Sequence, residues 1–221
     1  MSLQVRQKQH RNKYMTSPSL KIHPNNPQAN KITQVVDVLK RGGVIIYPTD
    51  TVYAMGCDIT QPKAIETICR IKGIDPAKHE FSILCQDISQ ISSYTKQLTN
   101  TVFRLLKKKL PGPHTFILPI GGDIPKSLHS KKKSIGIRVS EHLIVNTILY
   151  QLGNPLLTTS IKHTDEILEY MTDPQEIYER YKNQVDLFID GGAGDNIPST
   201  VWDCTSDEIQ LLREGKGNIE Y

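Results

Sequence analysis

The chain lacks any apolar run approaching the roughly 20 residues that cross a bilayer, so no membrane-spanning helix is predicted. Its opening residues contain no apolar segment of the kind found in secretory signals, so a cytoplasmic location is expected. The four cysteines show no CxxC or metal-finger spacing. We expect reduced and mostly buried thiols at these positions: Cys57, Cys69, Cys85 and Cys204.

Several familiar catalytic motifs are also missing. There is no GxxxxGK[ST] loop, which excludes a P-loop NTPase, and neither a GxGxxG turn after a strand nor a GxSxG elbow occurs. The seven histidines show no HxxxH or HExxH spacing, so a structural zinc site is not expected. Nothing in the spacing favours a Cys-His nucleophile.

The excess of positive charge is small and local. The formal net charge is +4, and residues 1–16 alone contain four cations and no acid, so the rest of the chain is neutral. We expect residues 1–19 to form a disordered basic tail and residues 20–221 to form a single domain. A solvated extension and a segment that contacts RNA or a membrane surface are both compatible with such a tail. Any anion-binding site in the domain must come from local clustering of cations.

Helical and extended patterns alternate from residue 20 onward. Ile32, Val35, Val36 and Leu39 form one apolar stripe of a helix, which RGG ends before a buried strand at 44–47. Val102, Phe103, Leu105 and Leu106 are expected to face inward on a helix that ends before PGP. Further helices are expected near 62–72, 143–153 and 174–181, and further strands at 82–85, 115–118, 135–139, 156–159, 185–190, 200–203 and 208–213. This order predicts an α/β fold with a twisted mixed sheet, closed by a hairpin.

Polar side chains and cations follow many of the predicted strands. The segment YPTDTVY places hydroxyls and the Asp50 carboxylate after a buried strand, where a ligand at a sheet edge would use them. The alternative is a turn in which Asp50 or Thr51 bonds its own backbone. Arg138 stands at the exit of another strand, where its side chain is placed to clamp a carboxylate or a phosphate.

Other candidates are individually weak. Arg70 and Lys72 near a helix end are suited to phosphate binding, but cations at helix C-termini are also ordinary partners of the helix dipole. The run Lys131–Lys133 predicts either a solvated loop or a contact with a nucleic-acid backbone. Hydroxyls and cations recur elsewhere at Thr115, 158–160, Lys162, Ser199, Thr200 and Arg213.

The order of these segments resembles the YrdC/YciO family over about residues 22–220. The matching segments are YPTDTVYAMG, RIKG, LPGPHTFIL, IGIRV, TTS, PSTVWD and LLREGKG, and ICRIKG, HEFSILCQD and QVDLFIDGG are most similar to the YciO branch. The resemblance implies a single YrdC-like domain with a large, positively lined concave cavity. Its best-understood members make L-threonylcarbamoyladenylate from L-threonine, bicarbonate and ATP with Mg²⁺, for the t6A modification of tRNA. Other members are described as binding double-stranded RNA or tRNA.

The resemblance also implies roles for particular residues of this chain. It assigns threonine binding to Thr51, Arg138, Ser160 and Ser199, and nucleotide binding to Lys72, Thr115, Lys162 and Arg213. In such a site Arg138 holds the threonine carboxylate, while Lys72 and Arg213 contact phosphates. No activated nucleophile is among these residues, so catalysis would depend on positioning and on charge stabilisation.

Two segments depart from the family pattern. Ile74 and Asp75 stand where the family has arginine and proline, and Lys162 stands where it has asparagine. A lost guanidinium removes charge-assisted hydrogen bonds worth about 1.5–3 kcal/mol each. Two hypotheses therefore stay open. The first is a threonylcarbamoyladenylate synthase, and the second is a YciO-type relative with weak or no synthase activity that binds nucleotide or structured RNA.

Overall fold

The computed structural model describes residues 16–75, 81–122, 124–125, 128, 133–161, 170–206 and 208–220. Residues 1–15 of the expected tail, Lys131, Lys132 and the candidate Lys162 lie outside these ranges. Within them, no helix is both long and apolar enough to span a membrane. All four cysteines are buried and unpaired, as their scattered spacing predicted.

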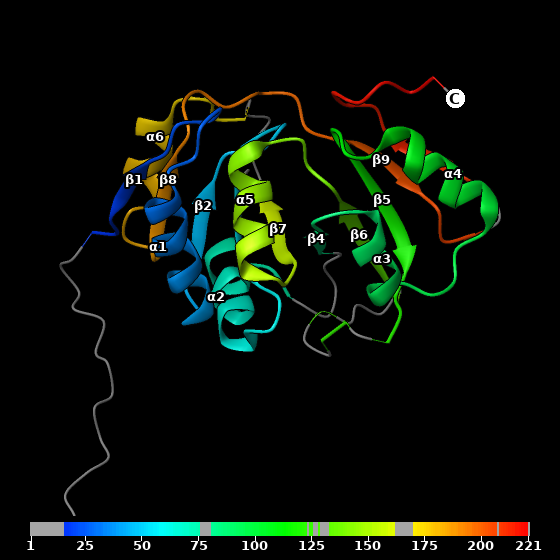
Figure 1. Ribbon diagram of the computed structural model, residues 1–221, viewed down its shortest axis with the longest axis horizontal. Coiled ribbons are helices and arrows are strands. Elements are labelled where there is room, and N and C mark those ends of the chain that lie inside the picture. Colours follow the sequence, from blue (N-terminus) through cyan, green and yellow to red (C-terminus); the bar gives the residue numbers. More distant parts are fainter. Residues whose placement is uncertain are drawn as a thin grey trace, which may run out of the picture.

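One mixed sheet of ten strands runs through the molecule (Figure 1), in the order β1-β8-β2-β3-β7-β4-β6-β5-β9-β10. Four neighbouring pairs are parallel and five are antiparallel, and the closing hairpin pairs β9 with β10 antiparallel. The predicted α/β class with a mixed sheet is therefore confirmed. The strands are β1 (Ser19–Lys21), β2 (Ile45–Tyr47), β3 (Ala54–Asp58), β4 (Ser82–Leu84), β5 (His114–Pro119), β6 (Ser134–Arg138), β7 (Leu156–Ser160), β8 (Leu187–Asp190), β9 (Thr200–Asp203) and β10 (Gln210–Arg213).

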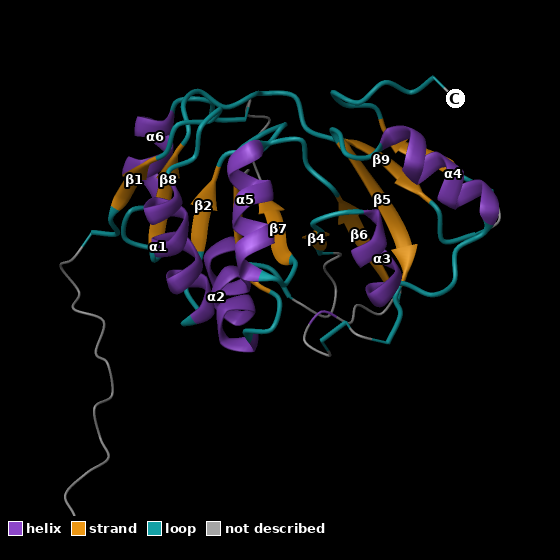
Figure 2. Ribbon diagram, in the orientation of Figure 1, coloured by secondary structure: helices purple, strands orange, loops and turns teal. Residues whose placement is uncertain are grey.

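Helices lie on both faces of this sheet (Figure 2) and begin and end at residues suited to those positions. Helix α2 has proline in its first turn and ends at Gly73, whose φ of 63° is a left-handed conformation that favours glycine. Asp173 caps α6 by accepting a hydrogen bond from the Gln175 backbone N–H. The helices are α1 (Ala29–Lys40), α2 (Pro62–Lys72), α3 (Ile88–Tyr94), α4 (Asn100–Lys109), α5 (Leu143–Leu152) and α6 (Pro174–Tyr181).

Two apolar clusters fill the space between helices and sheet. On strand β2, Ile45 and Tyr47 belong to the cluster that contains the buried residues of α1 and α5, whereas Ile46 belongs to the cluster with α2, α4 and α6. Successive side chains of a strand point to opposite faces, so β2 is covered on both. Burial on both faces explains why the strand is apolar throughout and shows no alternation.

Helices α1 and α5 cover only part of one face of the sheet. Strands β4 and β7 mark the change, because Leu84 and Leu156 belong to the α1–α5 cluster. Two residues away on the same strand faces, Ser82 and Thr158 instead line a cavity. The pairing register places Ser82 beside both Thr158 and Gly136. Small and polar side chains thus form the floor of an open region on this face.

The structure differs from the sequence predictions at a few places. Phe103 was expected to face inward, but it is 42% exposed, and the Lys107 ammonium lies 5.2 Å from its ring centroid. That prediction was wrong because the buried stripe of α4 consists of Val102, Leu105, Leu106 and Lys109. At the N-terminal end, the buried Ser17 hydroxyl donates to the Lys182 backbone oxygen at 2.7 Å. The packed chain thus includes residues that precede the expected domain start at residue 20.

Candidate functional site

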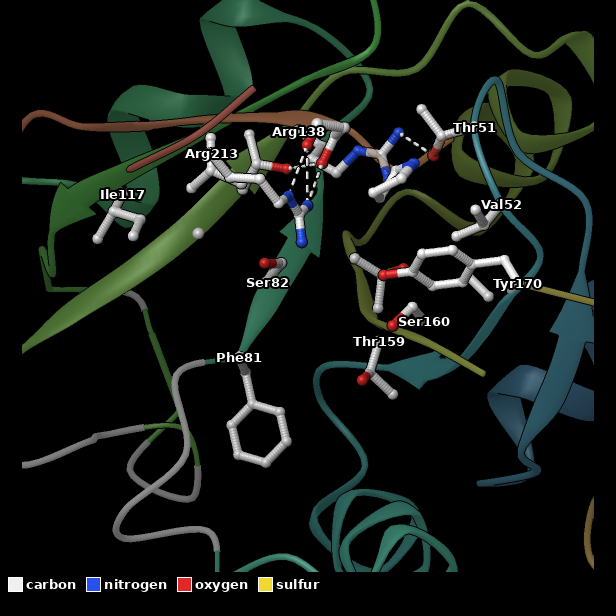
Figure 3. A pocket seen from close by; sticks show the side chains of 17 residues that line it. Thr51, Val52, Phe81, Ser82, Ile117, Arg138, Thr159, Ser160, Tyr170 and Arg213 are labelled. Carbon is white, nitrogen blue, oxygen red and sulfur yellow. Dashed lines mark hydrogen bonds between the residues drawn. The ribbon is translucent and has the colours of Figure 1, made fainter. Parts of the chain in front are cut away.

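The candidate site is a cavity of about 310 Å³ on the uncovered half of the sheet, open to solvent. Its lining comes from the β2–β3 loop, from strands β3 to β7, and from the start of β9 and the end of β10. Figure 3 shows its side chains, with hydroxyls and two guanidinium groups projecting toward the same space. Six of the eight predicted site residues line it: Thr51, Thr115, Arg138, Ser160, Ser199 and Arg213.

Arg138 is the most strongly held cation of the cavity. Its Nη2 donates to Asp50 Oδ1 at 2.9 Å and to Thr51 Oγ1 at 3.0 Å, and both charged side chains are less than a tenth exposed. The guanidinium Nε is buried and has no hydrogen-bond partner. The Arg138 side chain lines the cavity, and a planar guanidinium is suited to binding a carboxylate.

The loop that carries Thr51 is shaped by its own hydroxyls. Thr49 Oγ1 accepts from the Thr51 backbone N–H at 3.1 Å and donates to the Val52 backbone oxygen at 2.7 Å. The YPTDTVY segment therefore forms a self-bonded turn, with Thr49 supplying the bonds in place of the expected Asp50 or Thr51. The same turn also presents Thr51 to the cavity, so the two alternatives considered from the sequence occur together.

Arg213 is the last residue of β10 and also lines the cavity. Its Nε and Nη2 donate to the Ser199 backbone oxygen at 3.1 and 2.8 Å. The Ser199 hydroxyl lies 2.8 Å from Thr115 Oγ1. These contacts connect the edge strand β10 to β9 and β5, and they place the guanidinium of Arg213 near the hydroxyls of Ser199 and Thr115. A cation beside hydroxyl donors is suited to phosphate oxygens.

Lys72 is not among the residues that line the cavity in the described part of the chain. Its ammonium group instead donates to the backbone oxygen of Ser160 at 2.8 Å, and the rest of Ser160 borders the cavity. Burial lowers the pKa of Lys72 from 10.5 to about 8. Ile74, at the position where the family has arginine, is partly buried and packs against the apolar core.

Sequence reasoning missed the aromatic and small residues of the cavity. Phe81 and Tyr170 both line it, as Figure 3 shows, but neither stands in a pattern that would distinguish it from a core residue. Gly136 belongs to the floor, and a methyl group added there would lie 2.3 Å from Ser82 Oγ and 3.2 Å from Thr115 Cγ2. The glycine of the IGIR segment, which has no side chain, therefore leaves space in the cavity that a larger residue would fill.

The site shows the chemistry of a binding pocket for anions. In the described residues, no group of three or more His, Cys, Asp or Glu side chains could hold a metal ion. The cavity lining there supplies hydroxyls and guanidiniums and contains no cysteine or histidine. Two cations at separate positions can hold two acidic groups of one ligand, or one group on each of two ligands.

Comparisons with known proteins show the family and the fold. The family Sua5_yciO_yrdC, described as "Telomere recombination", matches residues 37–215. The chain is 43% identical over 201 residues to "Uncharacterized protein YciO" of Escherichia coli (strain K12), covering 90% of this chain and 96% of that protein. The crystal structure of E. coli YciO matches with a TM-score of 0.86 and 41% identity, covering 92% of this chain and 98% of that one.

A more distant structure shares the fold. The crystal structure of P. abyssi Sua5 complexed with L-threonine matches with a TM-score of 0.82 at 22% identity, covering 90% of this chain and 58% of that one. The family match spans most of the sequence, and the identity to YciO extends over nearly the whole of both proteins. The chain therefore belongs to the Sua5/YciO/YrdC family.

Proposed function

We propose that the cavity binds L-threonine and ATP and forms L-threonylcarbamoyladenylate, with bicarbonate as the third reactant and pyrophosphate as the second product. The observation that carries the proposal is the convergence of Arg138 and Arg213 with hydroxyls from six separate segments on one cavity. A site of this kind can hold an amino-acid carboxylate and a nucleotide phosphate near each other. The product would serve t6A modification of tRNA.

The proposed reaction has two stages. The threonine amine attacks bicarbonate carbon, and loss of water leaves a carbamate. A carbamate oxygen then attacks the α-phosphorus of ATP, and the bond to the β-phosphate oxygen breaks to release pyrophosphate. Neither stage requires a covalent bond to the protein, which fits a cavity whose described lining contains hydroxyls and cations and no cysteine or histidine nucleophile.

The protein's contribution is to position the reactants and to stabilise charge. In this proposal Arg138, with Thr51 hydrogen-bonded to it and Ser160 elsewhere in the lining, takes the threonine carboxylate. Arg213, Ser199 and Thr115 contact phosphate oxygens. Lys72, whose ammonium group bonds the Ser160 backbone oxygen, would supply a second cation for the phosphates besides Arg213. Guanidinium and hydroxyl donors aimed at phosphoryl oxygens stabilise the charge that develops as pyrophosphate leaves.

Magnesium would enter this site on the phosphates of ATP. The described residues offer no carboxylate cluster for a metal, and Mg²⁺ commonly keeps several waters and binds through substrate phosphates. When bound it would neutralise phosphate charge and favour the departure of pyrophosphate. The donors present in the cavity fit this mode of binding, because hydroxyls and cations can surround a magnesium–ATP complex without competing for the metal.

Support from the comparisons is of two kinds. Family membership supports a function related to that of the Sua5 and YrdC proteins, whereas the similar YciO protein is itself uncharacterised. A Sua5 structure was solved with L-threonine, which supports an amino acid as one ligand of this fold. For this chain, threonine, ATP, bicarbonate, tRNA and a cytoplasmic location are all parts of the proposal.

The test is release of pyrophosphate from ATP in the presence of bicarbonate and Mg²⁺, with and without L-threonine. The proposal predicts release that depends on threonine and is reduced by Arg138→Ala and by Arg213→Ala. Tyr150→Ala is a suitable control, because that residue is exposed and is not among the described cavity residues. ATP binding without any threonine-dependent release would contradict the synthase proposal.

A second function is favoured by the position of Ile74. Its side chain packs against the core at the place where the family has arginine, so one expected phosphate contact is replaced by apolar packing. This replacement supports a protein that binds nucleotide, tRNA or double-stranded RNA and has weak or no synthase activity. Binding to duplex RNA or tRNA that weakens with salt, together with absent pyrophosphate release, would favour it over the synthase.

A further inference from the structure

Asp50 lies behind the cavity wall and is held from several sides. Its side chain is 8% exposed, and its Oδ1 accepts hydrogen bonds from Arg138 Nη2 at 2.9 Å and from Ser140 Oγ at 2.6 Å. The backbone oxygen of Asp50 accepts from the Lys216 ammonium at 2.9 Å. Lys216 is itself paired with Asp195 at 2.7 Å. The carboxylate therefore has a fixed position relative to β6, which carries Arg138.

The consequence for Arg138 is a fixed orientation of the guanidinium. Asp50 and Thr51 both bind Nη2, while Nε is buried without a partner. A guanidinium is planar, so fixing one nitrogen at the end of the side chain restricts the direction in which the others point. Arg138 lines the cavity, so an incoming carboxylate would meet the part of the guanidinium that this orientation leaves facing the cavity. Asp50 is not among the residues that line the cavity in the described part of the chain, so it acts through Arg138.

We propose that Asp50, held by Ser140 and Lys216, is a positioning residue that orients the Arg138 guanidinium toward the carboxylate of an amino-acid substrate. That this substrate is L-threonine rests on the proposed function. It adds a role for Asp50, Ser140 and Lys216, three residues from separate parts of the chain that come together at this point.

Asp50 has two opposite effects on the binding of an anion. Its negative charge neutralises that of Arg138, and by this effect alone its removal would tighten the binding of a carboxylate. Its hydrogen bond orients the guanidinium, and by this effect its removal would weaken binding. The positioning proposal requires the second effect to be larger. The sign of the change in threonine affinity therefore distinguishes the two.

The experiment compares Asp50→Ala and Asp50→Asn with a matched control. Asparagine keeps the volume and one acceptor oxygen but removes the charge, whereas alanine removes both. We expect Asp50→Ala to weaken threonine binding about 10- to 100-fold with little change for ATP, and Asp50→Asn to restore much of the loss. The control is Asp58→Ala, which removes another buried carboxylate, hydrogen-bonded to Thr60 and Asn154 but not to Arg138. Equal or tighter threonine binding in Asp50→Ala would overturn the proposal.

A second readout does not depend on threonine. Phenylglyoxal modifies arginine side chains, and mass spectrometry gives the rate at Arg138 with Arg213 as an internal reference. Release of the guanidinium in Asp50→Ala should accelerate modification of Arg138 several-fold, with no change in Asp58→Ala. An unchanged rate would overturn the positioning role. If the wild-type protein binds no threonine while Arg138 responds as expected, the proposed substrate is wrong but the orientation of Arg138 by Asp50 still holds.

Discussion

The lowered pKa of Lys72 leads to a pH dependence of nucleotide binding. Burial favours the neutral amine and brings the pKa of Lys72 down from 10.5 to about 8. Only the charged form attracts phosphate, and with this pKa about nine-tenths of the side chain is charged at pH 7 and about one-tenth at pH 9. If Lys72 contacts the ATP phosphates, affinity should therefore fall about tenfold between pH 7 and pH 9.

The effect on stability has the opposite sign. Between pH 8 and pH 10.5 the unfolded chain holds more protons at Lys72 than the folded protein does, so this residue makes the folded state more stable as pH rises through that range. Weaker ATP binding at pH 9 therefore cannot come from the effect of Lys72 on folding. The two measurements separate a loss of ligand contact from a loss of structure.

Isothermal titration calorimetry in buffers of different ionisation enthalpy is the assay for this prediction. At pH 8, ATP binding should be accompanied by uptake of about half a proton, because phosphate restores the charged form of Lys72. Lys72→Met is the matched control, since it keeps the length of the side chain but has no titratable group. Its affinity should be lower at pH 7 and nearly constant up to pH 9. A tenfold fall in that variant, or no fall in the wild-type protein, would refute the assignment of Lys72 to the nucleotide.

Three further predictions concern the cavity and its floor. Arg138→Ala should cost about 1.5–3 kcal/mol in threonine binding and leave ATP binding nearly unchanged, as calorimetry can show. Ile74→Arg should increase threonine-dependent pyrophosphate release if the missing guanidinium limits the rate, and a thermal melt would show the lost core packing; no gain at retained stability would mean that the position does not limit the reaction. Gly136→Ala should lower the free energy of unfolding by about 1–3 kcal/mol in urea denaturation, because the new methyl group would meet Ser82 and Thr115; an unchanged midpoint would show that these side chains move aside.

Local patterns predicted the elements whose apolar residues follow a clear period. Helix α2 begins at Pro62 and ends at Lys72, the bounds that proline and glycine indicated in the sequence. Strand β3 was missed because its sequence, AMGCD, contains a glycine and no β-branched or aromatic residue, so its composition does not indicate a strand. Helix α3 was missed because Ile91 is its only buried residue, which leaves no apolar stripe to detect.

The site was predictable in its residue types and less so in its contacts. Hydroxyls and cations at strand ends indicated Thr51, Arg138 and Arg213, and these residues do line one cavity. The partnership of Asp50 with Arg138 joins positions 88 residues apart, and no local pattern indicates it. Likewise, only the packed structure reveals that Lys72 bonds the backbone oxygen of Ser160 from outside the cavity lining.

The proposed function requires one cavity to hold an amino acid at Arg138 and a nucleotide at Arg213. A crystal structure of the protein with L-threonine and a non-hydrolysable ATP analogue tests it most directly. We expect the threonine carboxylate within hydrogen-bonding distance of the Arg138 guanidinium and phosphate oxygens within that distance of Arg213. Ligands bound on another face of the molecule, or a cavity left empty at saturating concentrations of both, would contradict it.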